Sequence, residues 1–253
     1  YKRQETFLLR EGTTTRFVIG IMNMIAANEV RVCMNEAGAR RQPFLFGVDF
    51  ELSEGFFVLD PLGQQEILFE VGGVSNSPMG EGISGVLSEK MFSMNPMAYE
   101  VYQEKFAVVR EGVARGDSFL LNLTVATGLD TNWTLEEIFH RAQSPYRLLV
   151  PGRFVCFSPE IFVRMDEGMI SSYPMKGTID ASVPDAERVI LEDYKERSEH
   201  NTIVDLIRND LNRVAERVDV KRFRYIDRLR VSRGEILQVS SEVTGRLTGD
   251  YYS

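Results

Sequence analysis

Short runs of alternating hydrophobic and polar residues, separated by turn residues, recur along this chain and are typical of antiparallel strands. In the last such run Val239, Val243 and Leu247 alternate with polar residues, which predicts one apolar and one polar face. The pattern predicts strands over residues 43–50, 55–59, 66–71, 118–125, 146–150, 154–158, 161–165, 169–173, 218–220, 225–231 and 235–247.

A spacing of three and four residues between apolar positions predicts helices elsewhere. These helices are expected over residues 21–40, 95–116, 134–143 and 185–216. Thr134 and Glu137 form a capping-box pattern at the start of the third helix. The second helix carries four apolar residues on one face, which predicts one buried stripe of Tyr102, Phe106, Val109 and Val113.

The order of these elements indicates the fold class. Strands are clustered and helices lie between the clusters, without the alternation of strand and helix that builds a parallel sheet. We therefore predict an α+β protein with large antiparallel sheets. Residues 1–20 show no clear period and are treated as an N-terminal extension of uncertain order, and residues 21–253 as a single domain.

Composition narrows the classes of function. The 253 residues are 43% hydrophobic and 26% charged, as in ordinary soluble proteins. A net charge of −8 and a pI of about 5.0 argue against a nucleic-acid-binding face. No apolar run approaches the length of a membrane span, and two distant cysteines suggest a reducing compartment. We expect a cytoplasmic protein without a nucleic-acid or membrane partner.

Lys176 lies in the turn-like segment 174–178, between a proline and two small residues. A lysine amine that is aimed by a rigid turn and desolvated can act as a nucleophile. Glu160 precedes the predicted hairpin 161–173 and Lys176 follows it, so both side chains can face one cleft. The alternatives are a solvated turn lysine, or a cross-strand ion pair in which the lysine stays protonated.

A second acidic candidate lies on the last predicted helix. Glu199 shares a helix face with Ile203, Leu206 and Asp210. A carboxylate on a largely apolar face should be neutral, paired or bound to a cation, and carboxylate oxygens suit magnesium. The alternative is a ladder of glutamate and arginine on a solvated face. Only two histidines, His140 and His200, occur in the chain, which disfavours a zinc site.

Seven motifs follow one another in the order found in a known family. The chain resembles the chorismate-utilising enzymes, densely over residues 95–247 and more loosely over 44–76. The resemblance implies antiparallel sheets packed face to face with flanking helices. The motifs are residues 116–124, 144–146, 158–160, 174–178, 196–200, 203–211 and 239–245.

The lysine of the segment 174–178 is informative within that family. Members that form anthranilate or isochorismate carry alanine there, whereas the aminating branch carries lysine. The resemblance implies that chorismate is aminated at C4 to 4-amino-4-deoxychorismate, in the 4-aminobenzoate and folate pathway. Lys176 would attack ring C2, Glu160 would protonate the leaving C4 hydroxyl, and ammonia would then enter at C4 and expel the lysine.

The resemblance also implies the binding residues and the partner. Gly177, Thr178, Gln238 and Ser240 would contact the substrate. Glu199 would hold a Mg²⁺ ion that orients the substrate carboxylate. The chain lacks a Cys/His glutaminase pattern, so ammonia would come from a glutamine amidotransferase subunit.

Two departures from the family pattern keep other interpretations open. Gln238 stands where anthranilate-forming members have histidine, which disfavours loss of pyruvate because glutamine carries no proton at neutral pH. The sequence stops at Ser253, before the family's second magnesium glutamate, and is expected to be incomplete at its C-terminus. The alternatives are an anthranilate-forming or other chorismate enzyme, or an inactive fragment that binds a partner.

Overall fold

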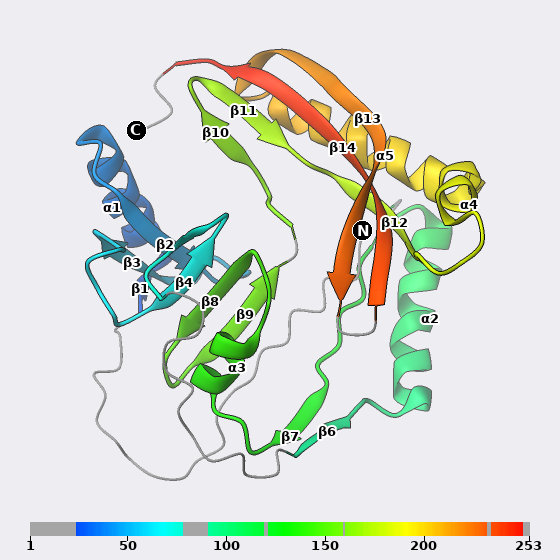
Figure 1. Ribbon diagram of the computed structural model, residues 1–253, viewed down its shortest axis with the longest axis horizontal. Coiled ribbons are helices and arrows are strands. Elements are labelled where there is room, and N and C mark those ends of the chain that lie inside the picture. The colour runs from blue at the N-terminus through cyan, green and yellow to red at the C-terminus, as the bar shows by residue number, and fades with distance from the viewer. Residues whose placement is uncertain (1–23, 78–90, 119–120, 159, 232–233, 250–253) are drawn as a thin grey trace. The chain divides into compact units, whose positions relative to one another are not determined.

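The structure is a computed structural model that describes residues 24–77, 91–118, 121–158, 160–231 and 234–249 (Figure 1). The chain divides into two compact units, residues 1–159 with residue 253, and residues 160–252. Every described strand pair is antiparallel, which confirms the predicted α+β class with antiparallel sheets. The predicted extension 1–20 lies outside the described residues, and the single domain 21–253 stays a prediction.

The described part of the first unit contains three small sheets. One has the order β1-β3-β2, and α1 lies against its strands β2 and β3. The second has the order β5-β4-β8-β9, and the third is the pair β6-β7. The helix α1 spans Ala27–Ala39. The strands of the three sheets are β1 Ile25–Ala26, β2 Phe44–Val48, β3 Glu54–Leu59, β4 Leu68–Val71, β5 Val74–Ser75, β6 Phe92–Asn95, β7 Gly128–Thr131, β8 Tyr146–Val150 and β9 Phe154–Ser158.

The helix α3 (Leu135–Arg141) starts with the predicted capping box. The Thr134 hydroxyl accepts a hydrogen bond from the Glu137 amide at 3.1 Å, and the Glu137 carboxylate accepts one from the Thr134 amide at 3.0 Å. Two amides that the first helical turn leaves without a partner are thereby satisfied. The helix then buries Leu135 and Phe139 in a core with Leu149 of β8.

The helix α2 (Tyr99–Arg115) differs from its prediction. It begins after Ala98 because residues 92–95 pair with β7, and it ends at Gly116 in the left-handed conformation. None of its residues is buried, and Phe106 is 47% exposed. The prediction of a buried stripe was therefore wrong. Apolar spacing defines a helix face, but it does not supply a surface that covers the face.

The strand predicted over 118–125 is also not observed in its described part. Residues 121–125 form no regular secondary structure, and residues 119–120 lie outside the described ranges. A strand needs a neighbouring backbone to satisfy its amides and carbonyls. None of the strands in the described part of the chain pairs with this segment.

The second unit is built around one long strand, β14 (Gly234–Leu247). One edge of β14 pairs with β13 (Ala215–Val231), which joins the two strands predicted over 218–220 and 225–231. The other edge pairs in turn with β12 (Met175–Asp180) and β11 (Met169–Ser172), and β10 (Arg164–Asp166) pairs with β11. Figure 1 shows β13 and β14 as a long curved hairpin.

The long helix predicted over 185–216 is broken at Asp193 into α4 (Ala186–Glu192) and α5 (Tyr194–Leu211). The Asp193 carboxylate accepts a hydrogen bond of 2.8 Å from the Glu196 amide, so the same residue ends one helix and caps the next. The buried residues of α5 are His200, Val204 and Leu211, of which Val204 and Leu211 pack with Val243 of β14.

The buried face of α5 is displaced by one position from the face that carries Glu199, Ile203, Leu206 and Asp210. Leu206 is 41% exposed and Asp210 is exposed, so the face of Glu199 is not the apolar face. Neighbouring residues on an α-helix point about 100° apart. Because the buried face is centred one residue further along the helix than the face of Glu199, His200 lies in the core and Glu199 lies at the edge of the core.

Both the apolar and the polar face of β14 are buried over the middle of the strand. Val239 and Val243 are at most 1% exposed, whereas Gln238, Ser240 and Glu242 are at most 9% exposed. Alternation correctly placed the apolar and polar residues on opposite faces. It could not show that the polar face is also removed from solvent.

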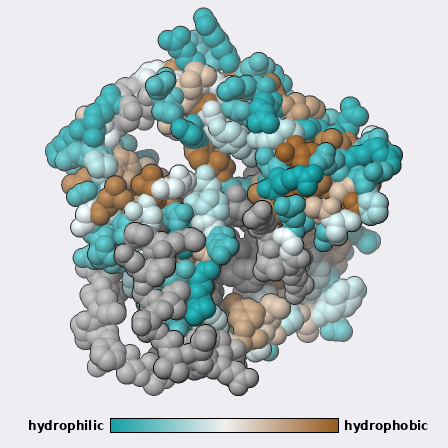
Figure 2. All heavy atoms as spheres, viewed as in Figure 1, coloured by the Kyte–Doolittle hydropathy of each residue, from teal (hydrophilic) through white to brown (hydrophobic). Residues whose placement is uncertain are grey.

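Figure 2 shows hydrophilic residues over much of the described surface in this view, with hydrophobic residues in separate patches. No helix among the described residues is long and apolar enough to cross a membrane.

The capping box of α3 provides a test of local stability. Replacing Thr134 by alanine should lower the free energy of unfolding by about 1 kcal/mol, because a helix-end amide loses its acceptor. Urea denaturation of the purified variant measures the change. The control is Thr202→Ala on exposed α5 surface, where the hydroxyl donates to the Ser198 carbonyl and caps no amide. Equal losses in the two variants would contradict the capping role.

Candidate active site

Lys176 lies in a bulge of β12. Met175 pairs with Ser240 and Thr178 pairs with Gln238, so two residues of β12 oppose one residue of β14. Gly177 has a φ of +84°, a conformation that residues with a Cβ atom rarely adopt. The predicted Pro-x-x-Gly-Thr segment is therefore a bulge within a sheet, which re-aims the lysine side chain.

The Lys176 side chain is directed at helix α5. Its Nζ atom lies 3.4 Å from Oε2 of Glu199, and its side chain is only 8% exposed. The Glu199 side chain is 38% exposed, and its second oxygen lies 3.8 Å from Nζ of Lys195. The structure thus brings together the predicted nucleophile and the predicted metal ligand, which are 23 residues apart in sequence.

A second carboxylate lies beside the bulge. A Cβ atom added to Gly177 would come within 3.1 Å of Oε2 of Glu196 and 3.5 Å of the Ile190 side chain. The bulge is therefore packed against both α4 and α5. Glu196 and Glu199 are three residues apart on α5, so their side chains are neighbours on the helix surface.

The predicted substrate-binding residues occupy neighbouring positions on the two paired strands. Thr178 lies directly opposite Gln238, and the Gln238 amide donates to the Ser240 hydroxyl at 3.4 Å. Gln238 and Ser240 are buried, whereas Thr178 is exposed. On the other edge of β14, Tyr225 pairs with Ser240, and burial raises the pKa of the Tyr225 phenol, with a further contribution from Asp227.

Glu160 begins the second unit at the base of the β10–β11 hairpin. It is half-buried, and it is two residues from Phe162, whose carbonyl accepts a 2.9 Å hydrogen bond from the Ser172 hydroxyl. This side-chain hydrogen bond joins the two chains beyond the paired residues of β10 and β11, but residues 160–163 form no strand, although a strand was predicted over 161–165. The proposed acid role of Glu160 stays a prediction.

One buried polar pair was missed by sequence reasoning. His200 of α5 and Ser241 of β14 are both fully buried, and the His200 Nε2 and Ser241 Oγ atoms are 2.6 Å apart. The position of His200 immediately after Glu199 was visible in the sequence. Its serine partner was not, because 41 residues separate the two.

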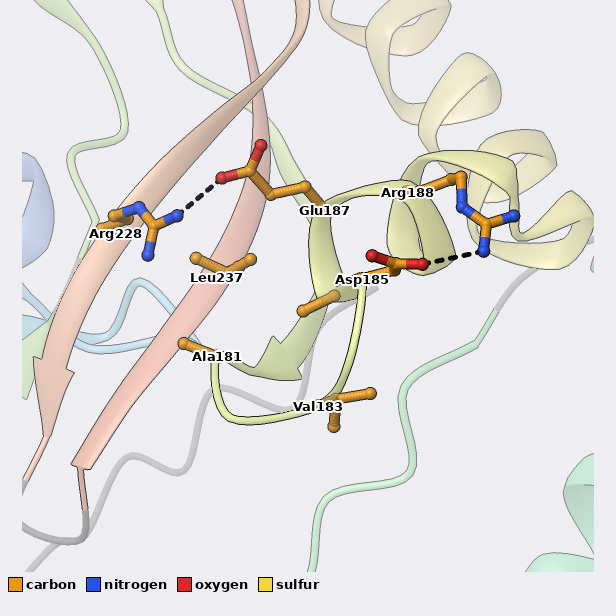
Figure 3. A pocket seen from close by; sticks show the side chains of 8 residues that line it. Ala181, Val183, Asp185, Glu187, Arg188, Arg228 and Leu237 are labelled. Atoms are coloured by element: carbon orange, nitrogen blue, oxygen red, sulfur yellow. Dashed lines mark hydrogen bonds and ion pairs between the residues drawn. The ribbon is translucent and has the colours of Figure 1, made fainter.

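Two hollows lie outside this cluster. The one in Figure 3, of about 380 Å³, is lined by Ala181, Val183, Leu237 and the ion pairs Arg228–Glu187 and Arg188–Asp185. A larger one of about 860 Å³ lies in the first unit around Phe50, Phe56 and Phe154. Neither is lined by the predicted site residues, so the candidate site is defined by its contacts and not by these hollows.

Comparison with known proteins decides the family. The family model for chorismate binding enzymes matches residues 87–252, about two thirds of the chain. The chain belongs to the chorismate binding enzyme family. An uncharacterised PabA-like protein of Haemophilus influenzae is 45% identical over 218 residues, which are 86% of this chain and 65% of that protein. The chain thus spans somewhat less than two thirds of that relative.

More distant members of the chorismate binding family extend this result. Aminodeoxychorismate synthase component 1 of Klebsiella aerogenes is 33% identical over 133 residues, covering 47% of this chain and 29% of that protein. A crystal structure from Bacillus anthracis, described as a 2,3-dihydroxybenzoate-specific isochorismate synthase, matches with a TM-score of 0.57 at 16% identity. It covers 90% of this chain and 64% of that one, and it supports the fold assignment alone.

The carboxylates of Glu199 and Glu196 are the candidate ligands for a magnesium ion. Among the described residues no group of three or more His, Cys, Asp or Glu side chains could hold a metal. Magnesium usually takes only one or two protein carboxylates and completes its shell with water and substrate oxygens. In this structure the two Glu199 oxygens face the amines of Lys176 and Lys195, so a magnesium ion bound by Glu199 would have to replace such a contact. Magnesium binding stays a prediction.

Gly177 offers a test of the bulge. Gly177→Ala should lower the free energy of unfolding by about 1–2 kcal/mol for the left-handed backbone, and further because the new Cβ would crowd Glu196. Gly168→Ala is the control, since Gly168 has a φ of +77° but nothing within 4 Å of the place that a methyl group would take. Denaturation curves compare the two variants. If Gly168→Ala is the more costly change, the packing assigned to the bulge is wrong.

Proposed function

We propose that this chain carries the amination site of an aminodeoxychorismate synthase component 1, which replaces the C4 hydroxyl of chorismate by an amine. The observation that carries the proposal is the buried Lys176, which a bulge directs at Glu199. Membership in the chorismate binding enzyme family and the name of the Klebsiella relative support it. The partial overlap with longer relatives makes the activity of the whole protein part of the proposal.

Lys176 is proposed to act as the nucleophile. The Lys176 ammonium first loses a proton to water, because only the neutral amine has an electron pair that can attack. Its Nζ then forms a bond to ring C2, the diene electrons shift toward C4, and the C4 hydroxyl leaves as water after Glu160 supplies a proton. Ammonia then bonds to C4, the electrons shift back, and the bond between C2 and Nζ breaks. Two displacements with good leaving groups replace one displacement of hydroxide.

The other predicted site residues are proposed to bind and orient the substrate. Gln238, Ser240 and Thr178 offer hydrogen-bonding groups on one face of the paired strands β12 and β14. Glu199, with Glu196 beside it, would hold Mg²⁺, which neutralises substrate carboxylate charge in an acidic protein. Gln238 cannot shuttle a proton at neutral pH, so retention of the pyruvyl enol ether is expected.

Ammonia is proposed to come from a glutamine amidotransferase partner. The sequence holds two cysteines, Cys33 and Cys156, and burial raises the pKa of the Cys156 thiol, which opposes its use as a thiolate. Ammonium salt should replace the partner in an assay. Glutamine should support the reaction only when the partner is added.

Lys176→Ala is the direct test of the nucleophile. It should reduce amination of chorismate, measured by chromatography with Mg²⁺ and ammonium salt, to the background rate. Lys221→Ala is the control, because Lys221 is a 65% exposed lysine of the same unit that pairs with Glu242. Amination by Lys176→Ala at the parental rate would disprove the covalent step. Fluorescent anthranilate as the parental product would instead support an anthranilate-forming enzyme.

Glu160→Gln tests the proposed acid. Loss of a general acid should slow amination by about 10²–10⁴-fold, because the hydroxyl then leaves without a proton donor. The binding of chorismate, measured by calorimetry, should change much less than kcat. A variant that loses affinity and keeps kcat would show that Glu160 binds the substrate and does not protonate it.

A further inference from the structure

The hydrogen bond between His200 and Ser241 joins α5 to β14 next to the candidate site. Both residues are fully buried, and the two atoms are 2.6 Å apart. The His200 ring also meets the edge of Phe223 on β13, with ring centroids 5.8 Å apart. Glu199 directly precedes His200 on α5, so the contacts of the ring act on the backbone next to Glu199.

Ser241 also holds the segment that leads to Lys176. Its backbone amide donates to the Pro174 carbonyl at 2.9 Å, two residues before Lys176. Its hydroxyl accepts a hydrogen bond from the Arg224 amide at 2.9 Å in addition to its bond with His200. One serine therefore contacts α5, β13 and the chain just before β12.

These contacts form a closed circuit around the candidate site. It runs from Lys176 through its ion pair to Glu199, along the chain to His200, across to Ser241, and back through Pro174. A buried hydrogen bond inside such a circuit is costly to leave unmade. The circuit can therefore hold the side chains of Lys176 and Glu199 next to each other, although one belongs to β12 and the other to α5.

Arg224 of β13 connects this circuit to helix α4 by further hydrogen bonds. Its guanidinium donates to the Leu191 carbonyl at 2.9 Å and to the Ile190 carbonyl at 3.3 Å, at the end of α4. Its backbone has a φ of +49°, at an irregular point of β13. The residue thus links the end of α4 to the hydroxyl that His200 contacts.

We propose that His200 is a positioning residue, which through Ser241 holds the Glu199 carboxylate at the Lys176 amine. The effect of His200 on catalysis rests on the proposed function. The effect of His200 on the position of Glu199 does not rest on it, because that position can be measured without turnover. A histidine that only filled the core would leave the contact between Lys176 and Glu199 unchanged when replaced.

Carbodiimide cross-linking measures that contact in the folded full chain. The reagent activates a carboxylate, and an adjacent amine then forms an amide with it. Glu199 has two amine neighbours, Lys176 at 3.4 Å and Lys195 at 3.8 Å. The link to Lys195 stays within α5 and serves as an internal reference. Mass spectrometry gives the ratio of the two products.

His200→Leu should lower the ratio of the Lys176 product to the Lys195 product by about tenfold, as expected for coupled neighbours. Ser241→Ala should lower it similarly, and the double variant should show no further loss. His200→Gln, which can still reach the serine, should restore most of the ratio. Val204→Ala, a buried change one turn further along α5, should leave it unchanged.

An unchanged ratio in folded His200→Leu or in Ser241→Ala overturns the proposal. If His200→Leu does not fold, Ser241→Ala and His200→Gln decide. In the amination assay His200→Leu should lower kcat more than it raises KM, with recovery in His200→Gln. Cross-linking that responds as expected in a protein that does not aminate chorismate would refute the proposed function and leave the positioning role intact.

Discussion

The ion pair between Lys176 and Glu199 is the interaction on which the candidate site depends. An ammonium group that is removed from water requires an anionic or hydrogen-bonding partner, since desolvation of an unpaired charge is costly. Lys176 is nearly buried, and its carboxylate partner belongs to a helix that follows β12 in the chain. The sheet and the helix must therefore meet at one defined register. Several features of the second unit serve that requirement.

The bulge in β12 and the break at Asp193 are two such features. Without the extra residue in β12, regular alternation would determine which sheet face Lys176 occupies. Without the break, one straight helix would have to run from Ala186 to Leu211. The break lets α4 and α5 both contact the bulge at Gly177, through Ile190 and Glu196. Local irregularities of backbone thus place the groups that regular elements would separate.

Sequence patterns correctly predicted the structural features that depend only on residues close together in the chain. The Thr134 capping box, the end of α2 at Gly116 and the hairpin β8–β9 all involve residues a few positions apart. Predictions that needed a distant surface were less successful. The stripe of α2 is not buried, and the buried face of α5 is displaced by one residue from the face that carries Glu199. Periodicity shows which residues share a face, but burial depends on what covers it.

The sequence by itself determined the family, the antiparallel α+β class and the residue types at the candidate site, because ordered motifs and alternation are local properties of the chain. Only the tertiary structure decided that Lys176 meets Glu199, that Glu196 lies beside Gly177, and that His200 contacts Ser241. Those contacts join residues 19 to 41 positions apart. They arise from the register of β12 on β14 and the packing of α5, neither of which any local pattern encodes.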